Sequence, residues 1–128
     1  MKKVAVIGTG SWGVALATHL ANLGNEIKMW SFNEEEARLI NEERSCKFLP
    51  GLKVPDGIVA DTDIKQVVND AEIIIHVTPS RFVRSTIQQY KDALKDQPVI
   101  ICSKGLENTS LKTLSQVAEE ELPGKRIG

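Results

Sequence analysis

The sequence predicts an α/β fold, in which helices cover both faces of a parallel, doubly wound sheet. Short apolar runs alternate along the chain with longer segments that carry apolar residues at helical spacing. Continuous apolar runs are typical of parallel strands that are buried on both faces. The expected strands are Lys3–Ile7, Glu26–Trp30, Ile58–Ala60, Glu72–Val77 and Pro98–Cys102.

The first strand, Lys3–Ile7, ends at a glycine and leads into Ser11–Leu23, whose apolar residues recur at helical spacing. Gly24 is expected to end this helix, because glycine is the usual residue at a helix C-terminus. After the second strand, Asn33 is expected to cap a helix that begins at Glu34. Three glutamates in its first turn suit the positive end of the helix dipole.

The middle of the chain, residues 45–57, contains two prolines and two glycines and is expected to be a loop. Beyond it, strands and helices continue to alternate, and the chain has no internal repeat. The helices expected here are Asp63–Val68, Arg81–Leu94 and Ser110–Leu122. The whole chain, residues 1–128, is expected to form one domain.

With 128 residues, 41% of them hydrophobic, the chain has the size and composition of an ordinary globular domain. Its formal net charge of −1 indicates no basic surface, so no nucleic-acid partner is expected. No apolar stretch approaches the roughly 18 residues of a membrane span, and the first apolar run is too short for a signal peptide. Cys46 and Cys102 fit no metal or redox spacing. We therefore expect a cytoplasmic protein with reduced thiols and no metal site.

A glycine-rich turn, GTGSWG at residues 8–13, follows the first strand and has G-x-G-x-x-G spacing. Gly8 would permit the tight turn, Gly10 would let a pyrophosphate approach the backbone, and Gly13 would let the helix pack against the strand. The phosphates would then bind free amides at the positive end of the helix. The pattern predicts a dinucleotide site in a Rossmann-type fold, and a glycine-rich turn without a ligand is the alternative.

The end of the second strand bears on which dinucleotide binds. In NAD-binding folds an acidic residue about 20 residues beyond the glycines holds the adenosine ribose. Here the strand is followed by Ser31-Phe32-Asn33, which contains neither an acid nor an arginine, and the nearest arginine is Arg38. Glu34 could reach the ribose, although its simpler interpretation is an acid in the first turn of a helix. The sequence therefore permits NAD or NADP.

Two further side chains are candidates for chemistry. Lys104 follows the fifth strand, at the edge of the sheet where ligands bind in such folds, so its ammonium could meet a phosphate or a reacting oxygen. A solvated turn lysine is the alternative. His76 lies inside an apolar strand and is interpreted as a core histidine with satisfied hydrogen bonds rather than as a catalytic base.

Four segments carry a resemblance to a known family: Gly8–Ala15, Phe48–Gly51, Val77–Ser80 and Ser103–Glu107. Together they resemble the bacterial NAD(P)-dependent glycerol-3-phosphate dehydrogenases, and the resemblance covers essentially all of the chain in order. The tryptophan inside the glycine turn makes this turn much more specific than the glycine pattern alone. The lysine-glycine segment after the fifth strand is the second specific mark.

The resemblance implies which residues contact the cofactor and the substrate. Many members have basic residues at two positions after the second strand, where this chain has Phe32 and Asn33, so the choice between NAD and NADP stays open. The family lysine after the fifth strand contacts both cofactor and substrate, which implies both roles for Lys104. The implied cofactor contacts are Gly8, Gly10, Ser11, Trp12, Gly13, Phe32, Asn33, Pro79 and Lys104.

The resemblance also implies the reaction, a hydride transfer that interconverts dihydroxyacetone phosphate and sn-glycerol 3-phosphate for phospholipid synthesis. In the family, a helical C-terminal domain carries the catalytic lysine and most of the substrate site. We therefore expect this chain to be the cofactor half, without a catalytic residue of its own, and we expect that domain and a phosphorylated small molecule as its partners. A non-catalytic NAD(H)-sensing regulatory domain and the cofactor domain of a hydroxy-acid or nucleotide-sugar dehydrogenase are the alternatives.

Overall fold

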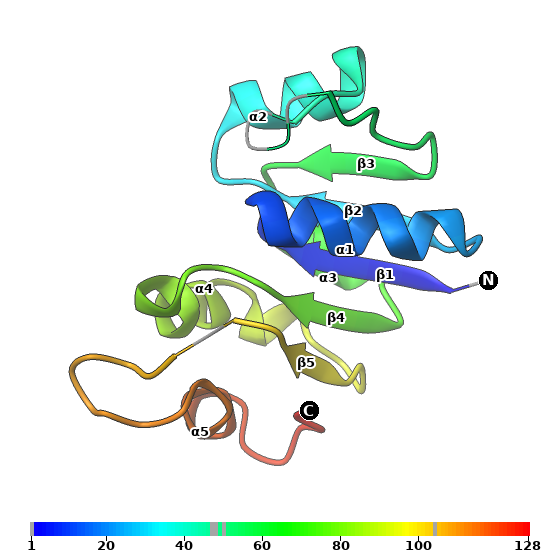
Figure 1. Ribbon diagram of the computed structural model, residues 1–128. Helices are drawn as coiled ribbons and strands as arrows, with labels where there is room; N and C mark the ends of the chain where they lie inside the picture. Colours follow the sequence, from blue (N-terminus) through cyan, green and yellow to red (C-terminus); the bar gives the residue numbers. More distant parts are fainter. Residues whose placement is uncertain (1, 47–48, 50, 104) are drawn as a thin grey trace.

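The computed structural model describes residues 2–46, 49, 51–103 and 105–128, which form a five-stranded parallel sheet with helices on both faces (Figure 1). The strand order is β3-β2-β1-β4-β5, so the first strand lies at the centre of the sheet. This arrangement confirms the predicted fold class. The strands are β1 (Lys3–Ile7), β2 (Glu26–Trp30), β3 (Ile58–Asp61), β4 (Ile73–His76) and β5 (Val99–Ile101). The α-helices are α1 (Ser11–Asn22), α2 (Glu34–Arg38), α3 (Ile64–Asn69), α4 (Val83–Tyr90) and α5 (Leu114–Glu121).

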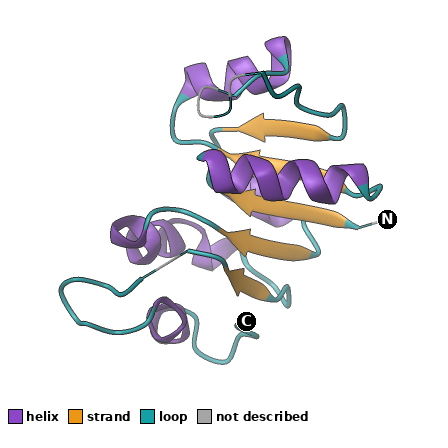
Figure 2. Ribbon diagram, viewed as in Figure 1, coloured by secondary structure: helices purple, strands orange, loops and turns teal. Residues whose placement is uncertain are grey.

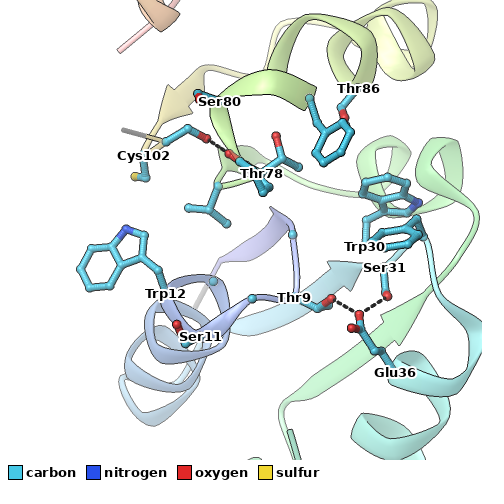
Figure 3. A pocket seen from close by; sticks show the side chains of 18 of the residues that line it. Thr9, Ser11, Trp12, Trp30, Ser31, Glu36, Thr78, Ser80, Thr86 and Cys102 are labelled. Atoms are coloured by element: carbon cyan, nitrogen blue, oxygen red, sulfur yellow. Dashed lines mark hydrogen bonds between the residues drawn. The ribbon is translucent and has the colours of Figure 1, made fainter. Parts of the chain in front are cut away.

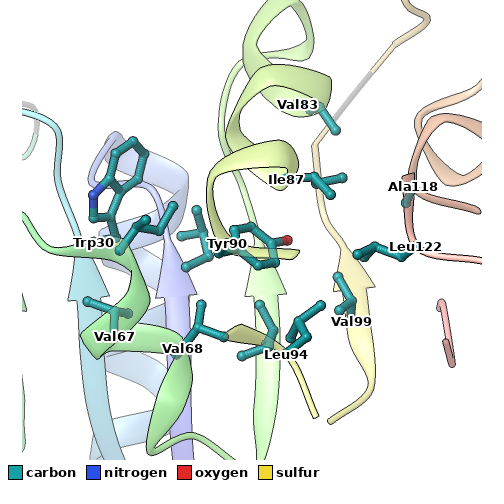
Figure 4. Close-up of a cluster of buried hydrophobic side chains, with 14 of the residues drawn as sticks. Trp30, Val67, Val68, Val83, Ile87, Tyr90, Leu94, Val99, Ala118 and Leu122 are labelled. Atoms are coloured by element: carbon teal, nitrogen blue, oxygen red, sulfur yellow. The ribbon is translucent and has the colours of Figure 1, made fainter. Parts of the chain in front are cut away.

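Different helices cover the two faces of the sheet, because successive side chains of a strand point to opposite faces. In β1, Val4 and Val6 belong to a buried cluster with Val14 of α1. Ala5 and Ile7 belong to a second cluster, to which α3, α4 and α5 contribute (Figure 4). Figure 2 shows α1 on one side of the sheet, with α3 and α4 on the other.

Local signals set the ends of the first two helices as the sequence predicts. Gly24 has a φ of +96°, and its N–H donates to the Ala21 carbonyl at 2.9 Å, which closes α1. The Asn33 side chain accepts hydrogen bonds from the N–H groups of Glu35 and Glu36, at 2.9 and 3.2 Å. These bonds satisfy two of the free donors at the start of α2.

The last helix begins later than the sequence pattern predicts. A helix is predicted over Ser110–Leu122, whereas α5 begins at Leu114. Thr113 and Gln116 form a capping box, in which each side chain accepts a hydrogen bond from the other residue's N–H. Leu111 has a φ of +59°, which a right-handed helix does not allow. The predicted start at residue 110 is therefore wrong.

The fourth predicted helix is shorter in the structure, whereas α3 has the predicted length and begins after Asp63. The helix predicted over Arg81–Leu94 consists of a 3-10 turn (Ser80–Phe82), then α4, then a second 3-10 turn (Lys91–Ala93). Such turns are frequent at helix ends and share the apolar spacing of a helix, so the sequence pattern merges them. A π-helical turn, Leu39–Glu43, continues α2. Among the described residues, none of the helices has both the length and the apolar character that crossing a bilayer requires.

The neighbouring strands β1 and β4 lie where the strand order reverses. The chain leaves β1 toward β2 and β3, and it leaves β4 toward β5. The two connections therefore separate at the carboxyl ends of these strands, and ligands of open α/β sheets bind in the crevice that this separation creates.

Candidate functional site

A cavity of about 1000 Å³ opens at the carboxyl ends of β1 and β4 (Figure 3). Its size is at the upper end of the range of about 300–1,000 Å³ for small-molecule sites. Most of its walls consist of glycine, hydroxyl and apolar side chains, and Glu36 is the one charged residue among the described residues that line it. The walls come mainly from residues 8–13, 30–32, 77–80 and 102–103, together with Phe82, Ser85, Thr86 and Gln89.

Two glycines of the turn have the packing roles that the sequence predicts. Gly8 has a φ of +132°, and a Cβ there would lie 3.1 Å from the Val77 carbonyl oxygen. A Cβ at Gly13 would lie 2.6 Å from the Gly8 carbonyl oxygen, closer than real side chains approach. The turn and the start of α1 can therefore pack this tightly against β4 only because both positions lack a side chain.

Gly10 differs from the other two, because the space beside it is open. A Cβ built there would meet nothing within 4 Å among the described atoms. Gly10 is the N-cap of α1 and provides no side chain to bind the amides of the first turn, which also contains no acid. The free N–H groups and the positive dipole end together can bind an anion that enters beside Gly10.

The structure brings four of the side chains predicted to contact the cofactor to one cavity. Ser11, Trp12, Phe32 and Pro79 all line it. Trp12 is 54% exposed and Phe32 is 78% exposed, so both residues present apolar surface that is open to a ligand. Flat rings of this kind can pack against a nucleotide.

Two other residues predicted to contact the cofactor are not among the described residues that line the cavity. Asn33 does not line the cavity, and its side-chain oxygen caps α2, so a cofactor contact from Asn33 stays a prediction. Lys104 lies outside the described residues. The two residues before it, Cys102 and Ser103, do line the cavity.

Glu36 lines the cavity although the sequence did not single it out. Its Oε2 accepts hydrogen bonds from the hydroxyls of Thr9, at 2.8 Å, and Ser31, at 3.0 Å (Figure 3). Among the three glutamates in the first turn of α2, Glu34 is the one that the sequence offers for the ribose, whereas the one that lines the cavity is Glu36. The signal was its place as the third residue of a helix capped at Asn33, because such a glutamate points back toward the helix N-terminus.

His76 is fully buried, and both of its ring nitrogens have partners. Nδ1 lies 2.9 Å from the Tyr90 hydroxyl, and Nε2 lies 2.7 Å from the Thr78 hydroxyl. Burial lowers the pKa of His76 to about 3, so the ring is neutral near pH 7. These contacts confirm that it is a core histidine. Because Thr78 lines the cavity, the ring holds a cavity hydroxyl in place from the core side.

The strand order and the position of the glycine turn define the class of this domain. A parallel sheet of order 3-2-1-4-5, with a G-x-G-x-x-G turn between β1 and α1 at the switch point, is a Rossmann-type domain.

Comparison with known proteins then gives the family. Residues 3–128 match the family described as NAD-dependent glycerol-3-phosphate dehydrogenase N-terminus. The chain belongs to this family, which confirms the resemblance drawn from its four motif segments. A curated relative, the glycerol-3-phosphate dehydrogenase [NAD(P)+] of Leptospira biflexa, is 40% identical over 125 residues, which are 96% of this chain and 38% of that protein.

Solved structures agree with this assignment. The glycerol-3-phosphate dehydrogenase of Coxiella burnetii has a TM-score of 0.91 at 27% identity, over 98% of this chain and 39% of that one. The enzyme of Saccharomyces cerevisiae has a TM-score of 0.86 at 33% identity, over 99% of this chain and 40% of that one. The chain thus spans well under half the length of these relatives.

Proposed function

We propose that this chain is the cofactor-binding domain of an NAD(P)-dependent glycerol-3-phosphate dehydrogenase. The complete enzyme would transfer a hydride from NAD(P)H to dihydroxyacetone phosphate. In the reverse direction it would transfer a hydride from sn-glycerol 3-phosphate to NAD(P)⁺. The observation that carries the proposal is the glycine turn, whose free helix amides adjoin a cavity of about 1000 Å³. Similarity to enzymes named for this reaction favours it over a sensing domain or a dehydrogenase for hydroxy acids or nucleotide sugars.

The residues present fit a dinucleotide. The pyrophosphate would bind the amides of Ser11, Trp12 and Gly13, in the open space beside Gly10. Trp12, Phe32 and Pro79 would pack against the flat parts of the cofactor. The bound nicotinamide would supply or accept the hydride, and the chain would orient it and exclude water.

The substrate contact proposed for this chain is Lys104, through its family position after β5. Its ammonium would hold the substrate and stabilise negative charge on the reacting oxygen. We propose that the catalytic lysine and most of the substrate site lie in a further, helical domain, since the chain spans only 38% of the Leptospira relative. The pathway proposed is glycerophospholipid synthesis, in the cytoplasm.

A titration with NADH tests the proposal. Trp12 lines the cavity, so energy transfer from its indole to the bound nicotinamide should report binding. We expect saturable binding of one NADH per chain. The energy-transfer signal should be lost when NAD⁺, which does not fluoresce, competes for the site. An absence of saturation up to about 1 mM, the upper end of usual substrate constants, would contradict the proposed function.

A further inference from the structure

The carboxylate of Glu36 is built into the wall of the cavity rather than placed there by a flexible side chain. It comes from the third residue of α2, and the hydroxyls of Thr9 and Ser31 both bind its Oε2. Thr9 is 7% exposed and Ser31 is 1% exposed, so both donors belong to the packed interior. Two buried donors on one oxygen fix the position of the carboxylate (Figure 3).

This carboxylate stands between two parts of the expected cofactor site. Thr9 belongs to the glycine turn, which would bind the pyrophosphate, and Ser31 directly follows β2. In Rossmann-type folds the adenosine ribose lies between these points, at the end of the second strand. Among the residues that the structure describes, none donates a hydrogen bond to Oε1 of Glu36. This oxygen can therefore accept a hydrogen bond from a ribose hydroxyl.

The negative charge of Glu36 is not neutralised by any cation in the described wall. None of the described lining residues is a lysine or an arginine. Arg38, which follows on the same helix, forms ion pairs with the carboxylates of Glu35, Glu42 and Glu43. Its charge is therefore already occupied by three acids outside the cavity.

We propose that Glu36 makes this site select NAD(H) over NADP(H). Its carboxylate accepts a hydrogen bond from the ribose 2′-hydroxyl of NAD(H), and it repels the 2′-phosphate of NADP(H), which carries nearly two negative charges. This inference rests on the proposed function, because it assumes a dinucleotide in the cavity. The inference narrows the choice between NAD and NADP, which the sequence leaves open. The selecting acid comes from the helix after the second strand and not from the strand end.

Separate titrations of the chain with NADH and NADPH test the inference. We expect NADPH to bind at least about tenfold more weakly than NADH, a difference of about 1.4 kcal/mol. Glu36→Gln keeps the size of the side chain and removes its charge, so the ratio of the two dissociation constants should fall about tenfold, mainly through tighter NADPH binding. Glu34→Gln is the matched control, because it removes a charge from the same helix at an exposed residue outside the cavity, and it should leave the ratio unchanged.

The possible outcomes separate this inference from the proposed function. If neither cofactor binds, the proposed function itself is wrong. If the wild-type chain binds NADH and NADPH equally, the proposed function stands and the role of Glu36 is wrong, without need of any variant. A selective wild-type chain with an equally selective, folded Glu36→Gln variant would also overturn the inference. If Glu36→Gln does not fold, Glu36→Ser provides the same comparison with a side chain too short to reach the ribose.

Discussion

At the scale of single residues, Gly10 tests how far cofactor binding depends on the glycine turn. Gly10 has a φ of −69° and a ψ of 177°, which any residue can adopt, and a Cβ there would meet no atom within 4 Å. A valine should therefore leave the fold intact while it fills the space that the pyrophosphate needs. We expect Gly10→Val to weaken NADH binding by about 100-fold or more, about 2.7 kcal/mol, without a change in the thermal midpoint.

Two other glycines provide the comparison for this variant. Gly13→Val should lower the thermal midpoint, because its Cβ would lie 2.6 Å from the Gly8 carbonyl oxygen. Gly57→Ala should bind NADH like the wild type, since its Cβ would make only ordinary contacts away from the cavity. Unchanged NADH affinity in a folded Gly10→Val protein would mean that the cofactor binds elsewhere.

His76 makes the stability of the fold depend on pH in a defined window. Burial lowers its pKa in the folded protein to about 3, against 6.5 for an ordinary histidine. Between these values the unfolded chain binds more protons than the folded one, so the free energy of unfolding falls as the pH decreases below about 6.5. The slope contributed by one such group is at most about 1.4 kcal/mol per pH unit.

Urea unfolding between about pH 6.5 and pH 5 should show this loss of stability, and His76→Gln should abolish that part of the slope. The window lies above the range in which Glu107 titrates, since Arg84 lowers the pKa of that carboxyl to about 2. An NMR titration of the His76 ring gives an independent reading. A midpoint near 6.5 in the folded protein would show that the ring is not held neutral by burial.

At the scale of elements, Arg84 connects α4 to α5 and to the segment after β5. Its guanidinium forms ion pairs with Glu107 at 2.8 Å, Glu121 at 2.7 Å and Glu120 at 3.1 Å. Glu107 belongs to the loop before α5, so this one side chain joins three parts of the fold. We expect Arg84→Met to accelerate hydrogen exchange of the Leu111 amide, which bonds the Glu107 carbonyl, by about fivefold.

Arg38→Met is the matched control for Arg84→Met. Arg38 also pairs with three glutamates, but all of them lie in its own helical segment. Its loss should therefore leave exchange in the loop before α5 unchanged. Equal exchange at Leu111 in Arg84→Met and wild type would show that the loop is held by its other contacts, such as the bridge between Leu106 and Thr113.

The elements also show which features the sequence could predict. The strands, the glycine turn and the Asn33 cap follow from local patterns, and the structure has all of them. The start of α5 could have been predicted from the capping pair Thr113 and Gln116, because this pair outweighs the apolar spacing upstream. The place of Glu36 was only partly available, because one of its partners, Thr9, lies 27 residues away and meets it only when β1 and β2 pair.

At the scale of the whole molecule, one continuous sheet supports the cavity in which we propose that the cofactor binds. The cavity is formed by the connections at the carboxyl ends of β1, β2, β4 and β5, and both faces of the sheet have a buried core. Residues 126–128 add to the edge beyond β5, where the Val99 N–H donates to the Arg126 carbonyl at 2.9 Å and the Gly128 N–H donates to the Val99 carbonyl at 2.8 Å. This edge continues the strand order to the sixth position of a Rossmann-type sheet. Because the sheet has its own buried core on each face, we expect this chain to bind the cofactor by itself.

We expect this chain to bind NADH without reducing dihydroxyacetone phosphate. Reduction of the carbonyl needs a group that can give a proton to the developing alkoxide. Among the described lining residues the titratable groups are Glu36, whose carboxylate two hydroxyls already bind, and Cys102, whose pKa burial raises. The ring of His76 is neutral, and its Nε2 is hydrogen-bonded to the Thr78 hydroxyl from the core side. Lys104 is proposed only to hold the substrate, and the catalytic lysine and most of the substrate site are proposed to lie in the further domain, so turnover should stay below about 1% of the typical enzyme value of about 10 per second. Loss of NADH absorbance with dihydroxyacetone phosphate present measures it, in the sample that shows NADH binding and beside the full-length Leptospira relative as a positive control. Turnover near about 10 per second would place a catalytic group in this chain and contradict the proposed division between a cofactor domain and a catalytic domain.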